Sequence, residues 1–172
     1  IEHLQKDINF SQYKIENENL PKATYALTYS KKGNPHNAYT FCMCPGGYVV
    51  PSATEKERLC VNGMSEHKRN GENANSALVA TVDYKTFGSG NLAGINFQRA
   101  IEEKAFILGG GKYLAPVQKV SDFLNETISL NLGQIKPTYK PGYKLSALNE
   151  IYPIGLTKVL KEAITNLSLI HI

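Results

Sequence analysis

Side chains able to bind an anion or to move a proton gather in one polar segment of this chain. The segment contains Ser65, His67, Arg69, Glu72 and Asn73. Arg69 could hold an anionic group through two parallel hydrogen bonds, and His67 or Glu72 could transfer a proton near neutral pH. The alternative is a solvated loop whose Asn and Gly residues form turns. For His67 this alternative is the stronger, because a single histidine is weak evidence for catalysis.

Three cysteines offer a second kind of chemistry, although their spacing matches no strong motif. Cys42 and Cys44 would face the same side of a strand, and with Cys60 and His67 they could supply four zinc ligands. A Cys-x-Cys pair with two distant partners is a poor match to zinc-site spacing, so we predict no metal site. A redox role would favour Cys-x-x-Cys or a cationic neighbour. The simpler interpretation, a small apolar residue, is the stronger one for Cys60. For Cys44, which stands at a strand end beside two glycines, it competes evenly with a functional role.

Two patches of glycine and other small residues stand out in the same region. They are Cys44-Pro45-Gly46-Gly47 and Asn70-Gly71-Glu72-Asn73-Ala74-Asn75-Ser76. Glycine loses the most conformational entropy on folding, so such patches are costly as plain structure. They are expected where the backbone must come close to another chain segment or to a ligand.

The elements that would position these residues begin with strands. Strands are predicted at residues 24–29, 38–43, 58–62 and 76–82, with residues 48–50 as the hairpin partner of 38–43. The strand at 76–82 is apolar on both faces, which suggests a central position. Residues 31–37 form a predicted turn, and residues 66–75 form a long polar loop of the kind that often carries function.

Helical periodicity takes over after residue 90. Phe97, Ile101, Ala105 and Leu108 share one face, with Ser89 or Asn91 as the cap and the glycines at 109–111 as the end. A second stripe follows Pro116, which suits a first helical position. Further helical pieces are predicted at 145–148 and 156–164, with a weak one at 4–14. This order predicts an α+β fold: a mixed, largely antiparallel sheet over about residues 24–84, followed by helices packed on it.

Composition narrows the class of protein. The 172 residues suit one domain, and the apolar share of 42% is enough for a core. The net charge of +4 is spread thinly, without the basic stripe that nucleic-acid binding requires. No apolar run is long enough for a membrane helix. We therefore predict a cytoplasmic protein that binds neither nucleic acid nor membrane.

Seven short segments of the chain carry a resemblance to known proteins: residues 41–47, 62–65, 70–78, 93–99, 109–113, 115–118 and 139–142. They resemble a family of bacterial FAD-dependent dehydrogenases with poorly defined substrates. The resemblance covers nearly all of residues 1–165, and its first block is the most specific. The family is similar in layout to flavoproteins in which a substrate domain is inserted into a Rossmann-type dinucleotide-binding fold.

The resemblance implies FAD as the cofactor of the parent protein and a small molecule as its substrate. It assigns the cofactor contact to Cys44, Pro45, Gly46 and Gly47. It assigns substrate binding to Met64, Ser65, Arg69, Asn73, Asn75 and Ser76. Backbone donors and a polar clamp from these two groups would shape the pocket over the flavin, which would carry the redox chemistry. No catalytic residue is assigned.

The chain lacks the sequence that would hold the dinucleotide itself. No strand leads into Gly-x-Gly-x-x-Gly, and Gly109-Gly110-Gly111-Lys112 lacks the spacing of a phosphate loop. We therefore expect residues 1–166 to be a substrate-side fragment that does not hold FAD well alone and whose partner is the missing FAD-binding portion. The start at Ile1 fits a fragment. Residues 167–172 resemble a translated sequencing adapter and are excluded from the domain.

Two functions compete at this point. One is a part of an FAD-dependent oxidoreductase, inactive by itself; the other is a non-catalytic module that binds a small ligand or a protein through the same loops. A neighbouring Gly-x-Gly-x-x-Gly unit in the longer reading frame would favour the first. Four further residues, Tyr113, Gln118, Tyr139 and Tyr143, either line a cleft or cover the core, and covering the core is the default.

Overall fold

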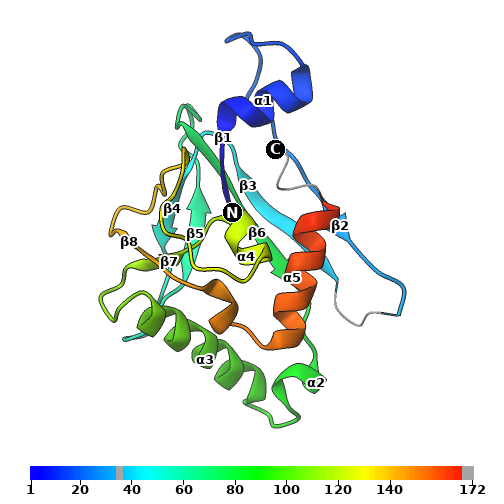
Figure 1. The fold of residues 1–172 in the computed structure, drawn as a ribbon, viewed down its shortest axis with the longest axis vertical. Coiled ribbons are helices and arrows are strands. Elements are labelled where there is room, and N and C mark those ends of the chain that lie inside the picture. Colours follow the sequence, from blue (N-terminus) through cyan, green and yellow to red (C-terminus); the bar gives the residue numbers. More distant parts are fainter. Residues whose placement is uncertain (34–36, 168–172) are drawn as a thin grey trace.

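The computed structural model describes residues 1–33 and 37–167 and confirms an α+β fold. Its main sheet has four strands in the order β1-β6-β3-β2, and every neighbouring pair is antiparallel. The bounds are Glu2–Leu4 for β1, Asn73–Ala80 for β6, Ala38–Cys44 for β3 and Thr28–Tyr29 for β2. The long strand β6 lies between β1 and β3, as its apolar faces predict (Figure 1).

A separate two-stranded sheet corrects one predicted pairing. Strand β4 (Tyr48–Pro51) pairs with β5 (Val61–Met64), whereas residues 48–50 were expected to return along 38–43. The reason lies at the end of β3, where the register with β6 shifts between Phe41 and Cys44 and Cys42 adopts a φ of 49°. Such a bulge bends a strand and ends its regular pairing, so the chain leaves the main sheet.

The helices agree with the prediction in part. Helix α1 (Gln5–Tyr13), α3 (Ala93–Leu108) and α5 (Ile154–Asn166) are found where periodicity predicts them, and α2 (Tyr84–Phe87) is additional. The predicted cap of α3 is wrong, because its N-cap is Leu92 and no side chain bonds the first turn. The side chain of Asp83 instead caps α2 by accepting from the Lys85 amide.

The region after α3 contains a small parallel sheet that the helical patterns did not predict. Strand β7 (Ala115–Val117) pairs with β8 (Tyr143–Leu145), so Pro116 lies in a strand and the expected helix at 145–148 is wrong. A two-stranded sheet tolerates a proline because its strands have free edges. Helix α4 (Val120–Leu124) and the 3-10 helix η1 (Leu148–Glu150) follow these strands.

The core lies between the main sheet and α5. Val159 and Ala163 of α5 pack against Ala38 of β3, and Ile164 packs against Phe123 of α4. Leu167 contacts both clusters. Residues 34–36 of the predicted turn at 31–37, and all of the predicted tail at 167–172 except Leu167, lie outside the described residues. Across 1–33 and 37–167, no helix has both the length and the apolar character of a membrane span.

Candidate functional site

Residues 45–47, which follow β3 and which we call the glycine turn, are packed tightly against the segment at 69–71. Gly46 has a φ of 52°, and a Cβ on it would lie 1.9 Å from the Arg69 carbonyl oxygen. A Cβ on Gly47 would lie 2.3 Å from the Met64 carbonyl oxygen. The Gly71 amide donates to the Gly46 carbonyl at 3.0 Å. Glycine is required at these positions because one chain segment approaches another.

The amides of this turn are already used inside the chain. The Gly46 N–H donates to Gln5 Oε1 at 2.7 Å, and the Gly47 N–H donates to the Asn73 carbonyl at 2.8 Å. Pro45 has no N–H, and residues 45–47 are buried. The expectation that Gly46 and Gly47 offer free backbone donors is therefore wrong. Neither amide has a proton left with which to bind FAD, and cofactor contact by Cys44, Pro45, Gly46 and Gly47 stays a prediction.

Gln5 is the residue of this region that sequence reasoning missed. Its side chain is buried at the start of α1, and its amide nitrogen donates to the Ala23 carbonyl at 3.0 Å and to Asn9 Oδ1 at 2.9 Å. Gln5 thus joins α1, the segment around Ala23 and the glycine turn. No local pattern marks it, because two of its three partners, Ala23 and Gly46, are 18 and 41 residues away in sequence.

The predicted substrate residues divide into an exposed group and a buried group. Met64 and Arg69 are exposed, and half-buried Ser65 donates from Oγ to the Pro45 carbonyl at 2.8 Å. Arg69 has a φ of 47°, and its guanidinium makes no ion pair with any residue in 1–33 or 37–167. His67 and Glu72 are exposed near it. The exposed side chains of this group, those of Met64 and Arg69, can meet a ligand or another chain segment.

Asn73, Asn75 and Ser76 form the buried group, because β6 begins three residues earlier than predicted. The amide nitrogen of Asn73 donates to Glu2 Oε1 at 3.1 Å and to the Lys136 carbonyl at 2.9 Å. Ser76 Oγ donates to the Ala77 carbonyl at 3.0 Å. Asn75 Nδ2 is buried without a hydrogen-bond partner in the described part of the chain. Substrate contact by these three residues stays a prediction.

The cysteines do not assemble with His67. Among residues 1–33 and 37–167, no three His, Cys, Asp or Glu side chains lie close enough together to hold a metal ion. The bulge at Cys42 breaks the strand alternation that would place Cys42 and Cys44 on one face. Burial raises the pKa of the Cys44 and Cys60 thiols, so neither is an activated thiolate.

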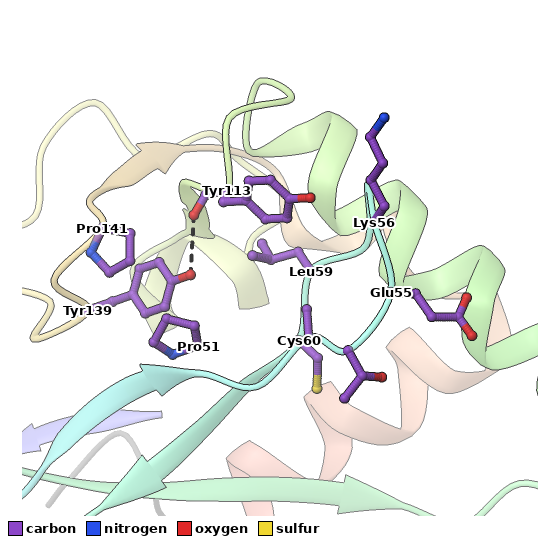
Figure 2. Close-up of a pocket in the computed structure, with 10 residues that line it drawn as sticks. Pro51, Glu55, Lys56, Leu59, Cys60, Tyr113, Tyr139 and Pro141 are labelled. Carbon is purple, nitrogen blue, oxygen red and sulfur yellow. Dashed lines mark hydrogen bonds between the residues drawn. The ribbon is translucent and has the colours of Figure 1, made fainter.

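A second region, which we call the tyrosine pocket, has a cavity of about 420 Å³. Its main lining residues are Pro51, Leu59, Cys60, Tyr113, Tyr139 and Pro141 (Figure 2). Two of the four candidate cleft residues, Tyr113 and Tyr139, therefore line it. Gln118 instead bonds the Thr127 carbonyl and the Leu148 amide, and Tyr143 is 44% exposed.

Hydrogen bonds and ion pairs fix the wall of the tyrosine pocket. The Tyr139 hydroxyl donates to the Tyr113 carbonyl at 3.2 Å, and burial raises the pKa of Tyr139. The Glu57 amide donates to the Tyr113 hydroxyl at 3.0 Å. The Arg99 guanidinium, on α3, donates hydrogen bonds of 2.8 to 3.0 Å to the Glu55 carboxylate. These hydrogen bonds lower the pKa of Glu55. The pocket is therefore built from the end of β4, the 53–60 segment, Tyr113 and residues 139–141, and Arg99 of α3 holds Glu55 from outside the lining.

Comparison with known proteins gives the family. Residues 1–169 match the sequence family described as "FAD-dependent protein, C-terminal domain-like". An uncharacterized protein of Clostridium beijerinckii is 49% identical over 170 residues, which span 96% of this chain and 32% of that protein. The chain thus covers about a third of the length of this relative. It belongs to the family of FAD-dependent proteins, within their C-terminal domain.

Proposed function

We propose that this chain forms the substrate side of an FAD-dependent oxidoreductase, a dehydrogenase whose flavin is bound by another portion of the parent protein. The family match over residues 1–169 supports the link to FAD. The Gly46 and Gly47 amides donate to acceptors within the chain, which supports the proposal that another portion of the parent protein holds the cofactor. The partners of the chain are then the FAD-binding portion and a small-molecule substrate. Its free cysteines suit the reducing cytoplasm.

The observation that carries the proposal is the exposed group beside the glycine turn. Arg69 is exposed, but its backbone is anchored: its amide donates to the Glu66 carbonyl at 3.0 Å, and its carbonyl lies against Gly46. A free guanidinium on a fixed backbone suits bidentate recognition of an anionic substrate. Met64 and Ser65 lie at the same turn and would extend this contact surface. Any residue that moves a proton remains to be identified.

The visible absorbance of the purified parent protein tests the proposal, beside that of this chain after addition of FAD and removal of unbound dye. We expect a flavin spectrum in the parent and none in the chain. A parent that stays colourless after FAD is added would overturn the proposal and favour a non-catalytic binding module. A flavin spectrum in the chain alone would show that the cofactor site lies within these residues, against the occupied amides of the turn.

A further inference from the structure

We propose that the tyrosine pocket binds a small flat aromatic acid, independently of the proposed flavin-linked role. Its volume of about 420 Å³ falls in the range of pockets that hold small molecules, about 300–1,000 Å³. None of the residues predicted to contact flavin or substrate lines it. The site therefore stands on its own geometry, and its test does not depend on a flavin.

The apolar walls select a flat ring. Figure 2 shows Pro51, Tyr139 and Pro141 grouped on one side of the cavity, with Leu59 and the Tyr113 ring toward the other side. Leu59 and Tyr139 are 6% and 5% exposed, so the surrounding protein holds both side chains in place. Aromatic rings and flat proline rings make favourable stacked or edge contacts with another ring.

Two groups at the rim select an acidic substituent. The Tyr113 hydroxyl accepts a hydrogen bond from the Glu57 amide, and its own proton has no acceptor in the described part of the chain. Lys56 also lines the cavity, is exposed, and makes no ion pair within residues 1–33 and 37–167. The nearby Glu55 is neutralised by Arg99. A carboxylate could accept from the hydroxyl and lie near the ammonium.

The rim is held in a conformation that the local sequence does not favour. Tyr113 and Glu57 both have left-handed backbones, with φ values of 58° and 56°, and they are joined by the amide–hydroxyl bond. The Tyr113 ring packs edge-on to Phe106 at a centroid distance of 4.8 Å. Left-handed non-glycine residues are uncommon and cluster at ligand sites. Here the strain fixes the hydroxyl before a ligand arrives, which reduces the entropy lost on binding.

The three cysteines provide the assay. Cys60 lines the cavity, whereas Cys42 is exposed and outside it. We expect indole-3-carboxylate, at ten times its dissociation constant, to slow alkylation of Cys60 in this chain about tenfold and to leave Cys42 unchanged, as read by peptide mass spectrometry. Calorimetric titration of the same probe measures the affinity without relying on thiol reactivity.

Two variants sharpen the assay. Ala53→Trp should fill the cavity and abolish both binding and protection, whereas Ala100→Trp, on the exposed side of α3, should change neither. Tyr113→Phe should weaken binding of indole-3-carboxylate about tenfold and leave that of uncharged indole within about twofold. Absence of binding in calorimetry, equal protection of Cys42 and Cys60, or binding that survives Ala53→Trp would each overturn the proposal.

Discussion

The glycine turn and the tyrosine pocket differ in how their backbones are used. At the turn, the Gly46 and Gly47 amides bond within the chain, and there is no space for a Cβ. At the pocket, Tyr113 and Tyr139 line a cavity of about 420 Å³, and the backbones of Tyr113 and its hydrogen-bond partner Glu57 are left-handed. The comparison teaches that a glycine-rich segment marks a close approach of backbone, and here the partner of that approach is another part of the chain.

The largest expected effect is at the closest contact of the turn. Gly46→Ala should lower the free energy of unfolding by at least about 4 kcal/mol, because the new methyl would meet the Arg69 carbonyl and the backbone has a positive φ. Gly90→Ala is the matched control, since nothing lies within 4 Å of its Cβ. Urea unfolding of both variants measures the difference. Equal stability of the two would show that the turn is not packed as described.

The free energy of unfolding should depend on pH through His3, which lies in β1 of the main sheet. Burial lowers the pKa of His3 from 6.5 to about 4, so the unfolded chain binds a proton that the folded chain does not. The stability contributed by neutral His3 is present above pH 6.5 and is lost as the pH falls toward 4, by about 3 kcal/mol in total. Urea titrations from pH 7 to pH 4 would show this loss.

His3→Gln tests that assignment, because it removes the buried imidazole that titrates. This variant should flatten the pH slope of stability between pH 6.5 and pH 4. A slope between pH 6.5 and pH 4 that persists unchanged in His3→Gln would assign it to other groups.

A smaller loss of stability is expected when a hydrogen bond of the glycine turn is removed without adding an atom to its packing. Gln5→Ala leaves the buried Gly46 amide without its acceptor and should cost about 2 kcal/mol of unfolding free energy. Gln12→Ala, in the exposed part of the same helix, should change stability by less than about 0.5 kcal/mol. If both variants unfold at the same urea concentration, Gln5 does not hold the turn.

Much of the fold could be predicted because its signals are local. The stripes of α3 and α5 and the two apolar faces of β6 are visible in short windows of sequence. The pairing of β4 with β5 could not be predicted in this way, because it depends on the bulge at Cys42 and on the contact between Gly46 and Arg69. Such contacts join residues that are distant along the chain.

The same reasoning explains what was predicted of the sites. The exposed position of Arg69 follows from the polar loop in which it lies. The burial of Asn73 follows from where β6 begins, which periodicity locates only to within a few residues. The tyrosine pocket is assembled from residues 51–60, 113 and 139–141. No local pattern connects these three segments.

The smallest expected effect is in the pocket. Tyr139→Phe removes the hydrogen bond to the Tyr113 carbonyl and should cost about 1 kcal/mol of unfolding free energy. Tyr143→Phe, at an exposed ring nearby in sequence, should be neutral. If Tyr139→Phe is also neutral in urea unfolding, the bond does not stabilise the pocket wall.

Residue-resolved amide hydrogen exchange tests most directly the claim that the glycine turn is committed to contacts inside the chain. The account predicts that the amides of Gly46 and Gly47 exchange far more slowly than the amide of His67 in the exposed loop. Both glycines are buried, and their amides donate to Gln5 Oε1 and to the Asn73 carbonyl. Exchange of Gly46 and Gly47 at the rate of His67 would contradict the account and leave those amides free to meet a cofactor.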